Sequence, residues 1–275
     1  MPKNAASVVV GGAAGDGSGS ATSIFLRACA ARQGLHVFAS YNYQSAIRGG
    51  HIYWKARIGE TKLQSQGDVI DVLFALNQES VAIHGPRVEP GGGVIFNADK
   101  VKIADGVLRP GASPYGLPVG DLTNPFGRLP IMQNTVGLGA LVWLFHMDFE
   151  PLEKAIRQQF GKKDPKIQDN NVGACRAGWE YAKAHFQPMD VKMKGDGKSR
   201  LFITGNDALG MGLLTGGCRF YAAYPMTPAT GILQYLINAA PPVGCLVKQA
   251  EDEIAVINMT IGAAHMGVRA ACGTS

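Results

Sequence analysis

The chain has 275 residues, which is enough for about two domains. Glycine accounts for 36 of them, well above the usual ~7%, but no Gly-X-Y repeat occurs and 46% of residues are hydrophobic, which excludes collagen-like and disordered chains. The formal net charge of +5 is mild and only 17% of residues are charged, so we expect large buried surfaces and no nucleic-acid partner.

The N-terminal part is expected to alternate strands with helices. A β-branched run over 7–10 predicts a strand, followed by the glycine-rich loop GGAAGDGSG and a helix over 21–33 that Gly34 closes. Further strands and helices are then expected, with a new helical segment beginning near Pro151: strands over 36–40, 52–58, 69–76 and 93–97, and helices over 131–160 and 171–186. This alternation predicts a three-layer α/β domain around a mainly parallel sheet.

The composition changes after residue 189. The polar segment 190–200 is expected to be a linker, after which the pattern begins again with a strand over 201–204, a turn over 205–206 and a helix over 207–218. We therefore predict two units, 1–189 and 201–275. The second is short for an independent α/β domain.

Two features of the sequence predict a cytoplasmic protein: no targeting segment is recognised, and the cysteines show no pairing pattern. The N-terminal sequence MPKNAASVVVGG lacks the long apolar core of a signal peptide, and the longest apolar stretch, 136–145, is too short to span a bilayer. The five cysteines are far apart and no C-x-x-C pair occurs, so they are expected to be free thiols. Their spacing matches no iron–sulfur motif, so the chain alone is not expected to ligate such a cluster.

A strand, a glycine-rich loop and a helix in succession form a common anion site, because backbone N–H groups at the helix start face the ligand. Gly15 and Gly17 would allow a close approach. However, the G-x-G-x-x-G and G-x-x-x-x-G-K-[ST] fingerprints both fail, and no acidic residue ends the next strand to bind a dinucleotide ribose. A ligand contact and a tight turn packed against a neighbour both remain open.

Arg48, Gly49 and Gly50 lie between aromatic residues and the strand expected over 52–58. A loop that presents one guanidinium suits a carboxylate or a phosphate. An exposed arginine on a hairpin-like turn is an equally good interpretation of the residues alone.

The second unit contains the segment YPMTPAT, in which Pro225 and Pro228 hold the backbone around Thr227 in a rigid turn between a strand and a helix. Such turns at strand ends are where α/β folds place ligand contacts. Further along, Glu251, Asp252 and Glu253 precede an apolar helix. Acids in a first helical turn also serve as caps and compensate the helix dipole.

The segments YPMTPAT and QAEDEIAVINMTIGAAHMG together resemble the pyrimidine-binding domain of the thiamine-diphosphate-dependent 2-oxoacid:ferredoxin oxidoreductases. The first unit resembles the gamma domain of the same family in its glycine-rich loop, its Arg48-Gly49-Gly50 segment and the strand DVLFALN. The resemblance covers nearly the whole chain. A gamma domain followed by an alpha domain in one polypeptide is typical of the two-subunit members, many of which use 2-oxoglutarate.

The resemblance implies oxidative decarboxylation of a 2-oxoacid, 2-oxoglutarate ahead of pyruvate or another oxoacid, to an acyl-CoA with electrons passed to ferredoxin. In the family a glutamate hydrogen-bonds N1′ of the aminopyrimidine of thiamine diphosphate. The spacing to the following glycines assigns this role to Glu253, with Glu251 as the alternative if the register differs by two. Thr227 matches a threonine that contacts cofactor or substrate, and Pro225 in the same turn is a further candidate for contact with the cofactor.

Arg48, Gly49, Gly50, Gly15 and Gly17 are further candidates for contact with substrate or coenzyme A. The family's diphosphate–Mg²⁺ motif and cluster cysteines belong to its beta subunit, so Mg²⁺ and a [4Fe-4S] cluster are expected there, in an (αβ)₂ complex.

Two features depart from the family pattern. The glycine-rich loop differs from the commoner G-x-G-G-Q-G, and the chain stops at Ser275 inside a Thr-Ser-Gly-Pro-Gly motif, which predicts a C-terminally truncated alpha part. A Rossmann-type NAD dehydrogenase and a non-catalytic scaffold subunit remain as alternatives.

Overall fold

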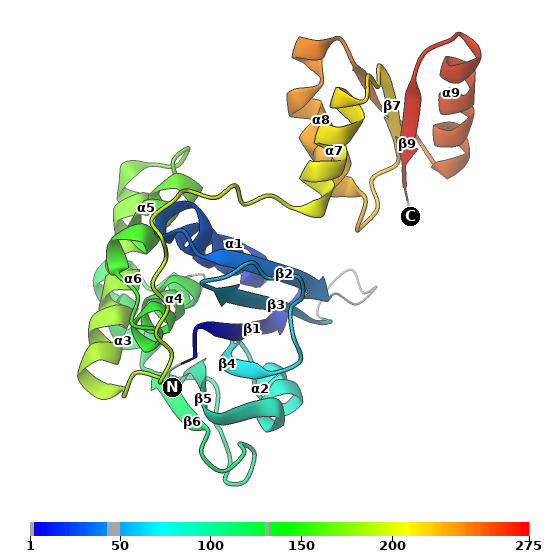
Figure 1. The fold of residues 1–275 in the computed structure, drawn as a ribbon. Helices are drawn as coiled ribbons and strands as arrows, with labels where there is room; N and C mark the ends of the chain where they lie inside the picture. The colour runs from blue at the N-terminus through cyan, green and yellow to red at the C-terminus, as the bar shows by residue number, and fades with distance from the viewer. Residues whose placement is uncertain (1–2, 43–49, 130–131, 275) are drawn as a thin grey trace. The chain divides into compact units, whose positions relative to one another are not determined.

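A computed structural model of the chain describes residues 3–42, 50–129 and 132–274. The chain divides into two compact units, Met1–Phe202 and Ile203–Ser275 (Figure 1). The segment 190–200, expected to be a linker, lies with the first unit: Val191 pairs with Lys3, and the Arg200 N–H donates to the Ala30 carbonyl at 3.1 Å. Among the described residues, no helix combines the length and apolar character needed to cross a bilayer.

The first unit is built on a six-stranded sheet with the order β2-β3-β1-β4-β5-β6. β1 pairs in parallel with β4, β4 with β5 and β5 with β6, whereas β3 runs antiparallel to both β1 and β2. The predicted mainly parallel α/β fold is therefore confirmed. The strands are β1 (Ala5–Ala13), β2 (His36–Asn42), β3 (His51–Gly59), β4 (Ile70–Ala75), β5 (Val88–Asn97) and β6 (Ser113–Leu117).

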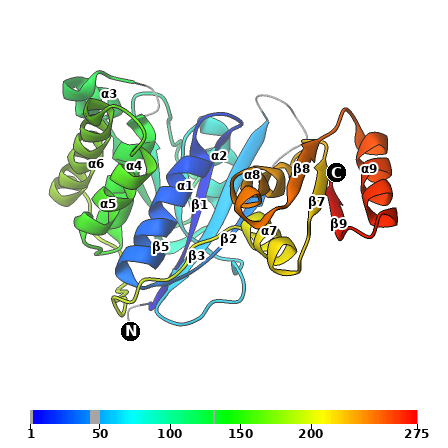
Figure 2. The ribbon, with the colours of Figure 1, turned by 90° about the horizontal axis from the view of Figure 1, so that it is seen from above.

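Alternate residues of the central strands face two different cores, as the period of two requires. Val8, Val10 and Phe74 pack into a large core with the helices on one side, whereas Val9 and Leu73 pack into a smaller core with α2 on the other (Figure 2). The helical elements of this unit are α1 (Ser18–Arg27), the π-helix Ala28–Gln33, α2 (Gln78–His84), the 3₁₀ turn Gly85–Arg87, α3 (Val119–Thr123), the 3₁₀ turn Asn124–Phe126, α4 (Met132–Leu144), α5 (Phe149–Gln159) and α6 (Pro165–His185).

The second unit has a three-stranded sheet in which β7 lies between β8 and β9 and runs parallel to both. Short parallel strands joined by helices explain why the apolar runs of this unit are only four residues long. Its elements are α7 (Gly205–Thr215), β7 (Phe220–Ala223), α8 (Thr230–Ala239), the 3₁₀ turn Pro241–Val243, β8 (Leu246–Gln249), α9 (Glu253–His265) and β9 (Ala270–Gly273).

The strand predicted over 201–204 is wrong. Leu201 is 76% exposed, and Thr204 is instead the N-cap of α7, where its hydroxyl accepts from the Asp207 N–H and the Asp207 carboxylate accepts from the Thr204 N–H. This capping box begins the helix at the residues predicted to be a turn. The helix expected over 131–160 is divided between α4 and α5, whereas Gly34 closes the first helical segment as predicted.

His51 of β3 and His84 of α2 form a buried pair, with 2.9 Å between their Nε2 atoms. One ring must donate and the other accept, so the pair holds only one proton between the two nitrogens. Burial, together with the nearby His51, Arg87 and Lys55, lowers the pKa of His84 to about 4 from its usual 6.5. Between pH 6.5 and about 4, His84 is therefore neutral in the folded protein but protonated in the unfolded chain.

This arrangement predicts loss of stability in mild acid. Between pH 6.5 and about 4 the unfolded state binds a proton that folded His84 does not, so the free energy of unfolding falls as pH falls through this window, by at most about 3 kcal/mol. The three tryptophans, Trp54, Trp143 and Trp179, all belong to the first unit, so urea melts followed by their fluorescence measure this unit alone. His84→Gln should flatten the pH dependence, whereas His36→Gln should leave it unchanged; equal slopes in all three proteins would contradict the assignment.

Candidate functional site

The candidate site of the second unit lies at the carboxyl edge of its sheet. Because β7, β8 and β9 are parallel, the segments that follow them leave the sheet at the same edge, where α/β folds bind ligands. The turn with Thr227 follows β7, and the acidic segment before α9 follows β8. The Ala250 N–H donates to the Ala223 carbonyl at 2.9 Å and joins the two segments at their start. The structure thus brings the two motifs singled out in the sequence together.

The turn after β7 is held at both ends. The Asn206 side-chain amide of α7 donates to the Pro228 carbonyl at 2.9 Å, and the Thr230 N–H donates to the Met226 carbonyl at 2.9 Å. Pro225 and Thr227 are exposed, and the peptide bond between Thr227 and Pro228 is cis. A fixed, exposed turn at this edge can present the Thr227 hydroxyl and backbone groups to a ligand.

The three acids before α9 differ in their local roles. Asp252 is the N-cap, and its carboxylate accepts from the Ala255 N–H at 2.7 Å. Glu253 is the first residue of the helix, and Glu251 precedes the cap; both are exposed, and neither carboxylate has a hydrogen bond among the described residues. Capping is therefore done by Asp252, which leaves both glutamates available to a ligand.

The glycine-rich loop of the first unit is occupied by its own carboxylate. Asp16 accepts from the Ala13 N–H at 2.6 Å and from the Ser18 N–H at 3.0 Å, so it binds the donors that an external anion would use. Gly15 and Gly17 have φ of 92° and 85°, which explains why glycine is needed there. Asn134 of α4 donates to the Asp16 carbonyl at 2.9 Å. These contacts favour the tight-turn interpretation of this loop.

Removing this carboxylate is expected to destabilise the first unit. Asp16→Ala leaves the Ala13 N–H at the end of β1 and the Ser18 N–H at the start of α1 without their acceptor, which typically costs about 1–2 kcal/mol. Asp16→Asn keeps one acceptor oxygen and should lose less. Urea unfolding followed by tryptophan fluorescence measures the difference, and an unchanged midpoint in Asp16→Ala would show that the carboxylate does not hold the loop.

The loop is adjacent to the end of the β2–β3 connection, because the Ala14 N–H donates to the Gly50 carbonyl at 3.2 Å. Gly50 therefore lies beside the glycine-rich loop, which is the other segment predicted to contact substrate or coenzyme A. Arg48 and Gly49 lie outside the described residues.

The thiols carry no metal site within the described residues. Cys29, Cys175, Cys218, Cys245 and Cys272 are free, as the spacing predicted, and burial raises the pKa of Cys29 and of Cys175 far above the ordinary value. In the described ranges, no group of three or more His, Cys, Asp and Glu side chains is placed to hold a metal ion.

Comparison with protein families identifies both units. Residues 7–181 match the family described as pyruvate ferredoxin/flavodoxin oxidoreductase, and residues 211–275 match the thiamine-diphosphate-binding domain of pyruvate flavodoxin/ferredoxin oxidoreductases. The chain is 27% identical over 326 aligned residues to a 2-oxoacid:ferredoxin oxidoreductase alpha subunit of Aeropyrum pernix, covering 98% of this chain and 50% of the relative. The chain thus spans about half the length of the curated relatives it matches.

Two solved structures are similar. A 2-oxoglutarate:ferredoxin oxidoreductase from Magnetococcus marinus, with 2-oxoglutarate, coenzyme A and succinyl-CoA bound, aligns over 98% of this chain and 47% of that one, with a TM-score of 0.86 and 30% identity. A keto/oxoacid ferredoxin oxidoreductase gamma subunit from Geobacter sulfurreducens aligns over 65% of this chain and 99% of that one, with a TM-score of 0.53 and 27% identity.

Proposed function

The chain belongs to the pyruvate ferredoxin/flavodoxin oxidoreductase family, and we propose that it is a fused gamma–alpha subunit of a cytoplasmic 2-oxoacid:ferredoxin oxidoreductase that acts on 2-oxoglutarate. Its enzyme decarboxylates the oxoacid oxidatively to an acyl-CoA and passes the electrons to ferredoxin. Pyruvate or another oxoacid is the alternative substrate. The NAD dehydrogenase alternative has no support, because the glycine-rich loop is occupied by Asp16 and both units match oxidoreductases of another class.

The observation that carries this proposal is the meeting of the Thr227 turn and the Glu253 helix start at one sheet edge. The donor set there fits the pyrimidine end of thiamine diphosphate. The Glu253 carboxylate, which Asp252 relieves of capping the helix, can accept a hydrogen bond from a protonated ring nitrogen. The turn that carries Thr227, which Asn206 holds in place, can orient the ring. When bound, this cofactor supplies the carbanion chemistry of decarboxylation.

In this proposal each residue has a separate task. Glu253 accepts the hydrogen bond from N1′ of the aminopyrimidine and holds the proton at that atom. Thr227, placed by Pro225 and by the Asn206 contact, orients the cofactor or the substrate. Asp252 keeps the helix start, and with it Glu253, in place by capping α9. In the first unit, Arg48, Gly49 and Gly50, together with Gly15 and Gly17, contact substrate or coenzyme A; of the first three, Gly50 is described and lies beside the glycine-rich loop.

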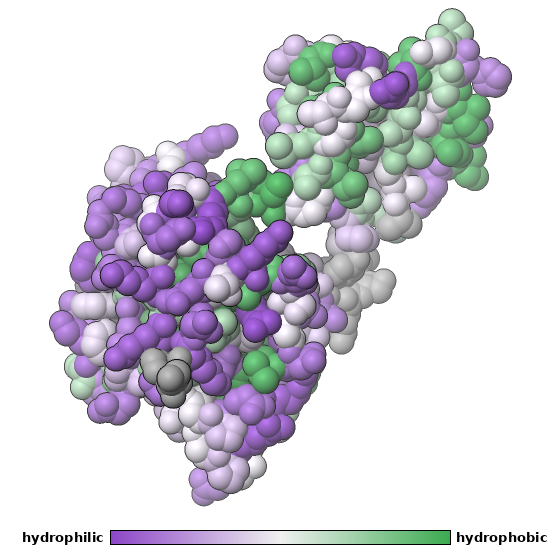
Figure 3. Space-filling model, in the orientation of Figure 1, coloured by the Kyte–Doolittle hydropathy of each residue, from purple (hydrophilic) through white to green (hydrophobic). Residues whose placement is uncertain are grey.

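The exposed apolar surface of the second unit supports the proposal that this chain acts only in a complex with a partner subunit. On α9, Ile254 is 71% exposed and Met266, just beyond its end, 82%, and Figure 3 shows hydrophobic residues gathered on the α9 side of this unit. Exposed apolar patches of this kind mark interaction surfaces. We assign the diphosphate, Mg²⁺ and [4Fe-4S] sites to a beta subunit that assembles with this chain in an (αβ)₂ complex.

Reconstitution tests the proposal. The protein, purified together with its beta partner, should reduce ferredoxin or a dye only when 2-oxoacid, thiamine diphosphate and coenzyme A are all present, with 2-oxoglutarate turned over faster than pyruvate. If pyruvate is turned over and 2-oxoglutarate is not, pyruvate replaces 2-oxoglutarate as the proposed substrate. Nicotinamide-dependent turnover by this chain without a partner, or full activity of a complex from which the chain is omitted, would overturn the proposal.

A further inference from the structure

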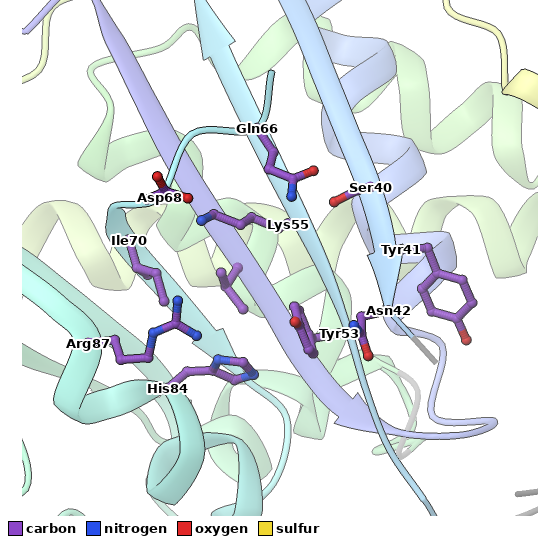
Figure 4. A pocket seen from close by; sticks show the side chains of 11 residues that line it. Ser40, Tyr41, Asn42, Tyr53, Lys55, Gln66, Asp68, Ile70, His84 and Arg87 are labelled. Atoms are coloured by element: carbon purple, nitrogen blue, oxygen red, sulfur yellow. The ribbon is translucent and has the colours of Figure 1, made fainter. Parts of the chain in front are cut away.

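The first unit has a polar cavity of about 340 Å³ on the face of the sheet that carries α2 (Figure 4). It lies over β1 and β3, and its lining residue Tyr53 stands opposite Gly11, the first residue of the glycine-rich loop, in the β1–β3 register. The side chains that line it come from six parts of the chain: β1, the end of β2, β3, the loop 60–69, the start of β4 and the end of α2 with its 3₁₀ turn. Nothing in the proposed oxidoreductase chemistry uses these residues.

Two cations, Lys55 and Arg87, line this cavity. Lys55 stands opposite Val9 in the β1–β3 register and is only 8% exposed, although lysine is among the residues least often buried. Arg87 enters from the 3₁₀ turn after α2, and Figure 4 shows its guanidinium directed into the cavity. Neither side chain forms a salt bridge among the described residues. The Lys55 stem is therefore largely buried while its ammonium opens to the cavity, and Arg87 is exposed at the cavity's edge, so both charges are accessible to a ligand.

The charge balance of the cavity also favours an anion. Burial, and then the nearby Arg87, lower the pKa of Lys55, whereas Asp68 opposes this effect. Asp68 is the one carboxylate among the lining residues, and it is exposed at the rim. His84 is neutral because its pKa is about 4. Two cations against one rim carboxylate leave the cavity net positive at neutral pH.

Neutral polar groups complete the lining. The buried Nδ1 of His84 has no hydrogen-bond partner within the described residues, which is an unusual state for a polar atom in a protein interior. Ser40, Asn42 and Tyr53 present hydroxyl and amide groups from β2 and β3. A ligand with several acceptor oxygens could engage these donors together with the two cations.

The cavity continues along the sheet. A second hollow, also of about 340 Å³, shares Gln66 and Asp68 with the first and is lined beyond them by Phe38, Gln64, Ser65 and Gly67. Phe38 and Ser40 lie on the same face of β2, because residues two apart in a strand point the same way. A ligand longer than a single ion would thus have an aromatic surface beside the cationic part.

We propose that this cavity binds the phosphate group of a small organic phosphate, with Lys55 and Arg87 as the two cationic contacts. A guanidinium fork and an ammonium on one side suit the tetrahedral oxygens of a phosphate, which carries up to two charges. The site does not use the N–H donors of the glycine-rich loop at Ala13 and Ser18, which Asp16 already occupies. The inference does not depend on the oxidoreductase activity, because it concerns binding by the first unit alone.

Calorimetric titration of the full chain tests this directly. Pyrophosphate is the probe for the phosphate contacts, coenzyme A is the organic phosphate, and succinate is the dianion without phosphorus. We expect pyrophosphate to bind and succinate to bind more weakly. Lys55→Met and Arg87→Gln should each weaken pyrophosphate binding by about ten- to hundredfold, the value of a charge-assisted hydrogen bond.

A variant expected to bind pyrophosphate more tightly shows that weaker binding in the other variants does not come from misfolding. Asp68→Asn removes the rim carboxylate and should tighten binding, by about two- to fivefold. Lys100→Gln, at an exposed lysine outside the cavity, is the matched control and should change nothing. Coenzyme A binding that is lost in Lys55→Met would support an organic phosphate as the occupant. No pyrophosphate binding, equal losses in Lys100→Gln, or tighter binding of succinate than of pyrophosphate would each overturn the proposal.

Discussion

Glu253→Gln is expected to lower turnover by about 10²–10⁴-fold in the complex with the beta subunit. The amide occupies the same volume but has no ionisable oxygen, so it cannot hold the proton at N1′ of the aminopyrimidine. Binding of thiamine diphosphate, followed by calorimetry, should weaken far less than turnover, because the diphosphate end is held elsewhere. A loss in activity with nearly intact binding separates a proton role from a merely structural one.

Glu251→Gln is the matched control. It lies two residues earlier, is equally exposed and carries no hydrogen bond among the described residues, so the same chemical change there should leave turnover nearly unchanged. Both variants must retain the wild-type far-ultraviolet circular dichroism, since loss of the first-turn acid Glu253 costs only about 0.3–1 kcal/mol and Glu251 lies before the helix. If Glu251→Gln is inactive and Glu253→Gln is active, the assignment is shifted by two residues. Full activity in both would remove the proposed role from this helix start.

Gly139→Ala is expected to destabilise the first unit by about 3 kcal/mol. Gly139 of α4 faces α6, and a Cβ there would collide with the Cys175 carbonyl and lie 2.8 Å from the Trp179 backbone nitrogen. The reciprocal contact is made by Gly178 of α6, whose Cβ would collide with the Val136 carbonyl. Because backbone rather than a side chain stands in the way on both sides, the two helices must move apart and lose buried apolar contacts.

Urea unfolding followed by tryptophan fluorescence measures this effect, since Trp143 and Trp179 lie on these two helices. Glu180→Ala, on the exposed side of α6, is the control and should change the free energy of unfolding by less than about 0.5 kcal/mol. Gly178→Ala should behave like Gly139→Ala. A stability within error of the wild type in both glycine variants would show that the helices can separate at no cost.

Much of the first unit was predictable because its strands are short apolar runs between helices with recognisable ends. The segments 7–10, 36–40, 52–58 and 69–76 lie within or largely overlap β1, β2, β3 and β4. The direction of β3 was not predictable, since an apolar alternating run is the same in a parallel and an antiparallel pair. The false strand at 201–204 shows the opposite case: an apolar run without a neighbouring strand takes another structure, here set by the Thr204 cap.

The candidate site was predictable to a similar degree. Thr227 and Glu253 were found as motifs, and parallel strands bring them to one edge for a reason that the sequence pattern already contains. Which acid caps α9 was not predictable, because Glu251, Asp252 and Glu253 are all suitable; the structure places Asp252 in that role. The Lys55–Arg87 cavity had no signal in the sequence, since its lining comes from segments as far apart as residues 9 and 87.

The sequence by itself determined the fold class and the family, because apolar periodicity and local motifs are properties of neighbouring residues. It also revealed an excess of glycine without saying what each glycine does. Only the tertiary structure separated those that adopt positive φ, such as Gly15 and Gly17, from those that let α4 and α6 approach, such as Gly139 and Gly178. Close approach of helices, occupation of a loop by Asp16 and convergence of cations are relations between distant segments, so they arise only when the chain is folded.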